Sequence, residues 1–495
     1  MESEPERQRE LRRFKWVIGV PYFVQGTSYL TEVPTLYFIK SALGMGDAGG
    51  QLFDSLRSGG WLIKPIWGYI SDRVPLFGYR RKSYFVLMAV LALLFWSLSA
   101  VLSAAGVRMP VVYLFTFNLA LATYAFVDVV CDALMVEHGR RLKRVGSFVN
   151  FQWTVLALSN AGALFLGGWF QEQIQSGALS YWVVFMTAGV PPLATAFVGL
   201  RNIEEAPVAR PERPRPQSAW SRTRLWTTVL SLPGRFAEFR RSNRVIWFLV
   251  LFIFFWKFSP SVGFIERSYL IDERAFQPAS FGTILSAGGL SFFASIVAYR
   301  WVVGRYRDIA WYQYLYAMVG LGVLSFPLSF YLYLDPGHPW WAAFEFLRAW
   351  PDALNPLPEW NRYEWFRLLT QTILGFATIP AFVIPLTLAG ETVKLQYAGV
   401  GYAFLMSLSN VTNMFEGVVG AGLYELFSQP WMRWLIGAFE GSALDIAGVA
   451  DERTLILQMF VYVSLLFTLL TVPFILLLKR ELRREGIVIH LGGGQ

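Results

Sequence analysis

KPIWGYISDRVPLFGYRRK, residues 64–82, joins an apolar run to a dense basic turn. The apolar run carries one lysine and ends at Asp72, after which Pro75 and Gly78 favour a turn. Three consecutive cations then precede the next apolar run. Apolar helices joined by a short basic loop are typical of a membrane protein, so this stretch predicts two spanning helices with a cytoplasmic connection.

The composition indicates the same class of protein. Of 495 residues, 55% are hydrophobic and 16% are charged, against about 25% charged in an ordinary soluble domain. About twelve apolar runs are long enough to cross a bilayer. The cations behind the net charge of +9 lie in short segments between these runs, which favours a role in membrane topology over binding of nucleic acid.

The sequence offers no pattern for a disulfide, a metal or a cofactor, and we expect none of them. There is one cysteine, Cys131, within an apolar run, and the three histidines lie far apart. Neither a disulfide framework nor the ligand spacing of a zinc site is present. The first apolar run is too long for the core of a signal peptide, so we expect it to be retained as the first helix.

The expected fold is an all-α integral membrane protein with twelve transmembrane helices in two pseudo-symmetric six-helix bundles. Residues 1–200 form the expected N-terminal bundle, residues 201–244 a basic cytoplasmic linker and residues 245–495 the C-terminal bundle. A weak internal repeat supports two related halves, because Pro34–Ser41 aligns with Pro260–Arg267 without a gap. The predicted spans are 15–39, 52–71, 83–105, 110–136, 147–170, 179–200, 245–270, 280–300, 311–334, 366–390, 398–424 and 454–478.

The cations fall on one side of the membrane if these spans are right, which predicts that both termini are cytoplasmic. The loops on the other side are poorer in cations or roughly balanced in charge, including the long segment 335–365. The cytoplasmic clusters are Arg12 to Lys15, Arg73 to Lys82, Arg140 to Arg144, the linker, Arg300 to Arg307 and Lys479 to Arg484.

Few charged side chains lie deep within the predicted spans. A charged residue at the centre of a spanning helix costs about 2.5 to 3.5 kcal/mol on insertion scales, so each needs a partner or a water-filled cavity. All of these residues except Glu416 are therefore candidates for substrate binding, as is Arg57, which lies with Asp54 at the outer end of the second span. With two asparagines of the eleventh span, the set consists of Glu32, Lys64, Asp128, Asp132, Lys257, Asn410, Asn413 and Glu416.

Asp128 and Asp132 are four residues apart and therefore share one face of a helix, where two carboxylates repel unless a cation or a proton intervenes. Lys64 lies roughly 12 Å from Asp72 along its helix, and Asp128 lies at a similar depth in its own span. We predict that Lys64 pairs with the aspartates. The pair is either a switch that exchanges partners when substrate or a proton binds, or a permanent structural ion pair.

Further candidates come from polar and aromatic positions. Gln25, Tyr29 and Glu32 form a polar stripe on the first helix, and Asn410 and Asn413 form a shorter one on the eleventh. Each stripe either faces a binding site or forms a hydrogen-bonded seam between helices. Lys257 lies just before an expected kink at Pro260 and is a candidate for binding an anionic group of a substrate, or for neutralising a nearby acid.

Two tryptophans within spans, Trp153 and Trp256, are placed to stack on a flat heterocycle. Packing against lipid or against other helices is the favoured explanation of an intramembrane tryptophan, because Trp is common in both settings.

Two motifs together resemble the folate-biopterin transporter family of the major facilitator superfamily. The first is Lys64-Pro65-x-x-Gly68-x-x-Ser71-Asp72-x-x-Pro75-x-x-Gly78-Tyr79-Arg80-Arg81-Lys82, and the second is Asp128-Val129-Val130-Cys131-Asp132-Ala133-Leu134-x-Val136-Glu137. The resemblance implies a rocker-switch carrier with a site at the membrane midplane. It also implies a cytoplasmic gate made by Asp72, Arg73, Arg80 and Arg81, with Glu137 and Glu391 as acidic counterparts.

The resemblance further implies folates and pterins as substrates. A carboxylate such as Asp128 or Glu32 suits the donors of a pterin ring, and Lys257 or Arg57 suits the carboxylates of a folate. The aspartate pair suggests proton-coupled symport. We therefore expect a small-molecule substrate, protons and the lipid bilayer as partners, no nucleic acid, and a monomer.

Two other functions stay open at this point. The same family includes carriers of other metabolites, among them S-adenosylmethionine. From a different class, an intramembrane prenyltransferase would use Asp128-x-x-x-Asp132 to hold Mg²⁺ on a diphosphate. Such an enzyme needs a second acidic motif of the same kind, and no other predicted span has one.

Overall fold

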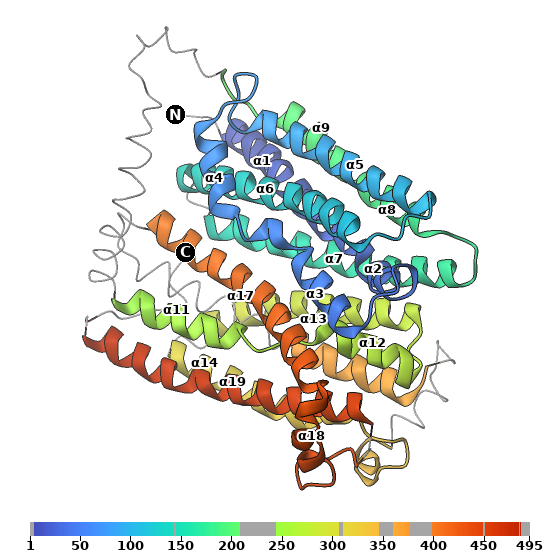
Figure 1. Cartoon of the computed structure of the whole chain (residues 1–495). Helices are drawn as coiled ribbons and strands as arrows, with labels where there is room; N and C mark the ends of the chain where they lie inside the picture. The colour runs from blue at the N-terminus through green and yellow to red at the C-terminus, as the bar shows by residue number, and fades with distance from the viewer. Residues whose placement is uncertain are drawn as a thin grey trace, which may run out of the picture.

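The computed structural model describes residues 4–142, 145–207, 244–305, 310–345, 360–376, 398–448, 451–484 and 486. Within these ranges the regular secondary structure is helical, and the only β feature is an isolated bridge between Leu76 and Tyr79 in the basic turn. The expected all-α class is confirmed. Figure 1 shows the helices of the first half, blue to green, lying together on one side of the helices of the second half, yellow-green to red.

The described residues of the first half form nine α-helices and three short segments of other helical type. They are α1 (Glu4–Thr27), η1 (Ser28–Thr31), α2 (Glu32–Tyr37), the π-helical η2 (Phe38–Ala42), α3 (Asp47–Leu56), η3 (Gly59–Trp61), α4 (Lys64–Arg73), α5 (Lys82–Ala104), α6 (Pro110–Leu142), α7 (Val145–Gln175), α8 (Tyr181–Gly189) and α9 (Pro192–Asn202).

The described part of the second half begins with α11 and ends with α19. Residues 362–376 are also helical. The named elements are α11 (Arg244–Lys257), α12 (Gly263–Arg274), α13 (Pro278–Arg305), α14 (Trp311–Phe330), η4 (Pro339–Phe344), α17 (Ala398–Phe427), η6 (Pro430–Met432), α18 (Arg433–Phe439) and α19 (Glu452–Arg484).

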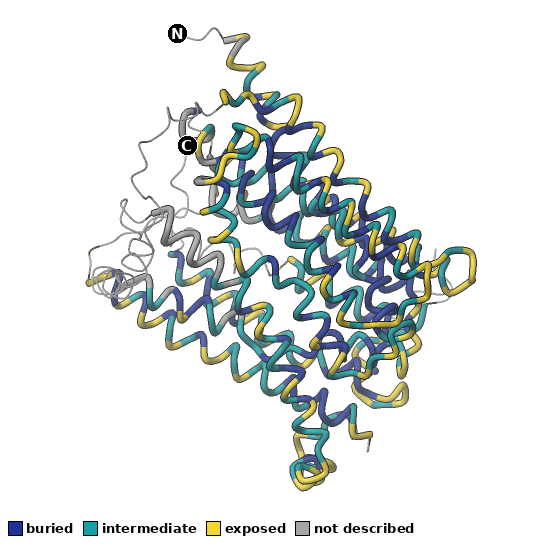
Figure 2. Tube along the Cα trace, turned by 45° about the horizontal axis from the view of Figure 1, so that its top comes forward, coloured by how far each residue is buried: buried dark blue, intermediate teal, exposed yellow. Residues whose placement is uncertain are grey.

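Among the described residues, seven helices are long and apolar enough to cross a membrane. Many of their apolar side chains point outward, as expected of helices surrounded by lipid, and Figure 2 shows buried residues concentrated between the helices. The seven are Lys82–Ala104, Pro110–Met135, Ser147–Gln175, Tyr181–Asn202, Pro278–Ala298, Trp311–Phe330 and Glu452–Arg484.

The other predicted spans are not among the seven for different reasons: three are broken into shorter pieces, the tenth is described only in part, and the eleventh is the continuous helix α17, which is not among the seven. The first consists of α1, η1, α2 and η2, and the second of α3, η3 and α4. The seventh is interrupted at 258–262, where Pro260 removes a backbone donor and ends the regular helix, as the expected kink predicted. Residues 377–390 of the tenth span lie outside the described residues, so a total of twelve helices stays a prediction.

The domain boundaries also stay predictions. α9 ends at Asn202 and α11 begins at Arg244, but residues 208–243 of the proposed linker lie outside the described part of the chain. Separate clusters of buried side chains are centred on each half. A cluster around Trp96 and Phe117 belongs to the first half, and one around Tyr331 and Phe366 belongs to the second.

The helices define two ends of the molecule, which we name by their composition. The basic end holds the start of α1, the turn between α4 and α5, and the end of α19. The opposite end holds residues 43–46 between η2 and α3, and the turn at 275–277 between α12 and α13. At the opposite end the two cores interlock, because Val33 and Tyr37 of α2 pack in the cluster of the second half and Phe264 of α12 packs in a cluster of the first.

α7 and α13 cross where neither helix carries a side chain. A Cβ atom on Gly168 would lie 2.7 Å from the Cα atom of Gly282 and 2.7 Å from the carbonyl oxygen of Pro278. Closer to the basic end, side chains fill the space instead, and the rings of Trp153 and Phe292 have their centroids 6.3 Å apart. Because glycine permits backbone-to-backbone contact, the main chains of α7 and α13 touch at the opposite end.

This crossing predicts that Gly168→Val destabilises the protein. The added side chain meets backbone atoms that have no room to move, and overpacking of this kind costs about 1 to 3 kcal/mol. Gly162→Val on the same helix is the matched control, because a Cβ atom there meets nothing within 4 Å. We expect the Gly168 variant, but not the Gly162 variant, to lower the melting temperature in detergent, and equal melting temperatures would contradict the packing argument.

Candidate functional site

Lys64 and Asp128 form a buried ion pair between α4 and α6. The Nζ atom of Lys64 lies 2.6 Å from Oδ2 of Asp128, and the Asp128 side chain is 5% exposed. The second span reaches α6 because Gly60 lies directly against Ala122, where a Cβ atom would come within 2.5 Å of the Ala122 backbone. The pairing predicted from depth along the helices is therefore present.

Trp61 completes the surroundings of the lysine. The ammonium group of Lys64 lies over the Trp61 ring, 4.7 Å from its centroid, so a cation–π contact supports the ion pair. The carbonyl oxygen of Trp61 also accepts a hydrogen bond of 3.4 Å from Asn410 on α17. Trp61 thus lies where the first half meets the second.

Asp132 has a different partner from Asp128. The hydroxyl of the buried Tyr22 on α1 donates a hydrogen bond of 2.8 Å to Oδ1 of Asp132. Lys64 pairs with one member of the aspartate pair rather than bridging both, which refines the prediction. Two carboxyl groups and one ammonium group therefore share this region of the first half.

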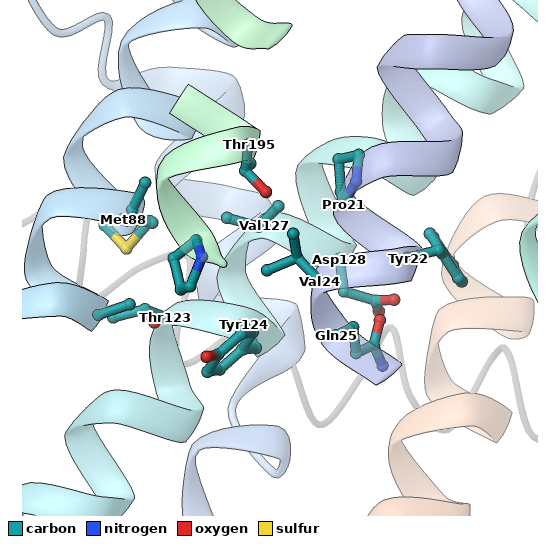
Figure 3. Close-up of a pocket in the computed structure, with 13 residues that line it drawn as sticks. Pro21, Tyr22, Val24, Gln25, Met88, Thr123, Tyr124, Val127, Asp128 and Thr195 are labelled. Carbon is teal, nitrogen blue, oxygen red and sulfur yellow. The ribbon is translucent and has the colours of Figure 1, made fainter. Parts of the chain in front are cut away.

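A pocket lies beside this cluster. It is enclosed by α1, α5, α6 and α9, and Figure 3 shows Gln25 and Asp128 pointing toward the same space from α1 and α6. Thr123 and Thr195 contribute hydroxyl groups, and most of the remaining lining is apolar. The structure thus brings Gln25, Lys64, Asp128 and Asp132 of the predicted set into one region, and their role in substrate binding stays a prediction.

Four charged side chains form a closed ring farther toward the opposite end. Arg57 donates to Oε2 of Glu32 at 2.5 Å and to Oδ1 of Asp54 at 2.8 Å. Arg267 of α12 donates to Oε1 of Glu32 at 2.8 Å and to Oδ2 of Asp54 at 3.1 Å. All four side chains are less than one-fifth exposed. We call Glu32, Asp54, Arg57 and Arg267 the charge ring; its charges cancel, which makes its burial tolerable.

The charge ring joins the two halves, because Glu32, Asp54 and Arg57 belong to α2, α3 and the end of α3, whereas Arg267 belongs to α12. Glu32 and Arg57 are among the residues that the sequence predicts to bind substrate. In the structure both are fully engaged in ion pairs. Arg267 was missed, although it lies inside the predicted span 245–270 and an intramembrane charge was the signal that selected the other candidates.

A second layer of charges lies outside the ring. Lys40 pairs with Asp272, and Arg453 contacts Oδ2 of Asp272 at 3.0 Å and Oδ2 of Asp47 at 2.9 Å. Asp272 lies beyond the predicted seventh span. Burial there favours the neutral carboxyl, but the hydrogen bonds from Lys40 and Arg453 outweigh it and hold the pKa of Asp272 below its ordinary value. The layer is therefore intact at neutral pH and weakens as the pH falls through that lowered pKa.

Backbone groups add to the closure of the opposite end. The backbone N–H of Phe264 donates to Oε1 of Gln51 at 2.8 Å. Gly417 of α17 lies against Ser55 of α3, where a Cβ atom would come within 2.0 Å of the serine hydroxyl. The unwound segment before α12 is also satisfied, because the N–H of Ser261 donates to the carbonyl oxygen of Glu416 at 2.9 Å.

The basic turn is held together within the first half. Arg81 donates from Nη2 to Glu137 at 3.0 Å and from Nη1 to Ser71 at 3.0 Å. The backbone N–H groups of residues 80–82, at the start of α5, all donate to the carboxylate of Glu205, a partner that sequence analysis missed. The side chains of Asp72 and Arg73, and all of Glu391, lie outside the described part of the chain, so the gate stays a prediction.

The remaining candidates are dispersed. Asn413 is exposed, and it shares the face of α17 that carries Asn410 and Gly417 toward the first half. Trp153 is half-buried and contacts Phe292 of the second half. The side chains of Trp256 and Lys257 lie outside the described residues, although the main chain places Lys257 at the last position of α11, directly before the unwound segment.

The overall arrangement is the major facilitator fold. The chain is similar to the POT family transporter PepTSo, with a TM-score of 0.61 at 11% identity over 95% of this chain and 99% of that one. It is also similar to a D-xylose-proton symporter, with a TM-score of 0.58 at 11% identity over 93% and 97% of the two chains. Identities this low establish the fold alone.

The sequence comparisons identify the family. The model of the BT1 family matches residues 25–335, and the chain belongs to that family. It is 26% identical to a folate-biopterin transporter of Synechocystis sp. over 476 residues, which cover 92% of this chain and 80% of the relative. It is 22% identical to folate transporter 1 of Plasmodium falciparum over 56% of this chain and 50% of that protein. The expected family and the integral membrane character are thereby confirmed.

The buried pair of Lys64 and Asp128 predicts a large effect of removing one partner. Lys64→Met leaves a carboxylate without its cation, a loss of about 3 to 5 kcal/mol for a buried pair. The double variant Lys64→Met/Asp128→Leu removes both charges and is expected to recover most of the stability.

Thermal melting in detergent measures this difference. Lys15→Met, at an exposed lysine of α1, is the control and should melt like the wild type. If Lys64→Met alone melts with the wild type, the pair contributes nothing to the fold. If the double variant is stable but inactive in transport, the pair has a function beyond stability.

Proposed function

We propose that this protein is a secondary active carrier that moves folates and pterins across the membrane by alternating access. The observation that carries the proposal is the closure of one end by ion pairs between the halves, the charge ring above all, on a fold shared with transporters. A pathway closed at one end requires its halves to separate there for substrate to pass. The described conformation is then the one with the opposite end shut.

The substrate class rests on the relatives and on the chemistry of the site. The similar proteins of Synechocystis and Plasmodium falciparum are a folate-biopterin transporter and a folate transporter. A pterin presents an amino group and a ring N–H, and these donors suit the carboxylates of Asp128 and Asp132. Trp61 and Trp153 supply aromatic faces at the junction of the halves.

Proton coupling follows from the count of charges near the pocket. Asp128 is neutralised by Lys64, whereas Asp132 has a hydroxyl as its partner. A second carboxylate on the same buried face favours uptake of one proton, and a proton bound there leaves the cluster neutral. We therefore propose that Asp132 carries the coupled proton and that the carrier is a symporter.

The orientation follows from the basic residues. Arg80, Arg81 and the last turn of α19 with Arg483 and Arg484 lie at the basic end. Short loops rich in arginine and lysine face the cytoplasm. The basic end is therefore the cytoplasmic side, with both termini on it, and the opposite end faces away from the cytoplasm.

The other functions are less well supported. A carrier of S-adenosylmethionine would use the same architecture and differs only in its substrate. For a prenyltransferase, the Lys64 ammonium occupies the position beside Asp128 that Mg²⁺ would take. The family and the similar solved structures also point to a carrier rather than an enzyme.

The decisive experiment is uptake of labelled folate, biopterin and S-adenosylmethionine by proteoliposomes of the purified protein, with and without a protonophore. We expect uptake of folate and biopterin that is driven by an inward proton gradient. Uptake of S-adenosylmethionine alone would agree with a carrier of this fold but would contradict folates and pterins as its substrates. Uptake of none, together with Mg²⁺-dependent release of diphosphate, would overturn the class.

Asp132→Asn tests the coupled proton. The amide keeps the partner of Tyr22 but has no proton to exchange, so we expect concentrative uptake to fall by about tenfold or more while counterflow exchange of substrate persists. Asp335→Asn, at an exposed acid beyond α14, is the control and should keep the gradient dependence. If the Asp132 variant shows unchanged gradient-driven uptake, another residue carries the coupled proton.

A further inference from the structure

The charge ring divides unequally between the halves of the molecule. Both partners of Arg57 belong to its own half, and one of them, Asp54, is three residues away on the same helix. Both acidic partners of Arg267 belong to the other half. When the opposite end opens, Arg57 therefore keeps its carboxylates and Arg267 loses both of its own.

Arg267 stays fixed on its own helix when this happens. Its Nε atom donates a hydrogen bond of 3.1 Å to the carbonyl oxygen of Gly263, one turn earlier in α12. The ion pairs to the other half use Nη1 and Nη2. Separation of the halves thus frees these two groups while the guanidinium group remains held by α12.

The freed groups match one kind of ligand. An arginine fork with two free N–H groups binds a carboxylate by two parallel hydrogen bonds, and it already binds two carboxylates in the closed ring. Nearby Glu266 does not compete directly, because it pairs with Arg367 at 3.4 Å. An anionic group of the substrate is therefore the natural replacement for Glu32 and Asp54.

We propose that Arg267 exchanges partners during transport and binds a carboxylate of the substrate when the opposite end is open. This inference rests on the proposed function. Arg267 then takes the role that the sequence suggested for Arg57, which is to bind the carboxylates in the glutamate part of a folate. The inference also makes Arg267 a determinant of specificity, since biopterin has no carboxylate and does not need this contact.

The test compares two substrates in one variant. Arg267→Gln removes the fork, so we expect KM for folate to rise by about tenfold or more and KM for biopterin to change by less than about threefold. Arg267→Lys keeps the charge without the planar fork and is expected to fall between the two for folate. Arg274→Gln on the same helix is the control, because the contacts of Arg274 among the described residues are with its own half, where it donates to the carbonyl oxygens of Leu332 and Tyr333.

A second variant covers the case in which Arg267→Gln does not fold. Asp54→Asn/Arg267→Gln removes one charge of each sign, so the remaining pair of Glu32 and Arg57 stays neutral, and the same split between the two substrates is expected. Equal changes in KM for folate and biopterin, or an unchanged KM for folate in either variant, would overturn the role of Arg267. Failure of the wild type to carry either substrate would instead overturn the proposed function.

Discussion

The charge ring of Glu32, Asp54, Arg57 and Arg267 ties α2 and α3 of the first half to α12 of the second. Burial of these four charges is tolerable because each carboxylate pairs with two guanidinium groups and each guanidinium group with two carboxylates. Removing any one side chain would leave its two partners with a single ion pair each. The outer layer of Lys40, Asp272 and Arg453 and the glycine contact of α7 with α13 close the same end. The two layers make that end a single cooperative contact between the halves.

The breaks in the helices place the functional groups. The second span is interrupted at Gly59 and Gly60, which lets Lys64 begin a new helix beside α6, with Asp128 within reach. The seventh span is interrupted around Pro260, and the freed N–H of Ser261 finds a partner on α17. Irregular main chain at this depth is stable only where other helices satisfy its polar groups, so the breaks lie between the halves rather than against lipid.

Sequence alone predicted the fold class and one buried ion pair, for physical reasons. Apolar runs and the positions of cations reflect the bilayer, which acts on every span separately, so the membrane class was accessible. The family was accessible through the resemblance of the motifs at residues 64–82 and 128–137. The pair of Lys64 and Asp128 was also accessible, because depth along a helix follows from residue count. The charge ring was not, since the partners of Glu32 and Asp54 depend on how the two halves meet. Tyr22, Trp61 and Glu205 were missed because nothing in their local sequence marks them as partners of Asp132, Lys64 and residues 80–82.

The central claim is that the opposite end opens by separation of the charge ring while the basic end closes. Distances between spin labels test this most directly, with one pair at exposed Ser41 and Glu273 of the opposite end and another at exposed Phe77 and Arg305 of the basic end. We expect a single short distance at the opposite end in the wild type. In Arg267→Gln we expect a second population of molecules, with a longer distance at the opposite end and a shorter distance at the basic end. A variant whose two distances stay those of the wild type, or lengthen together, would contradict the claim.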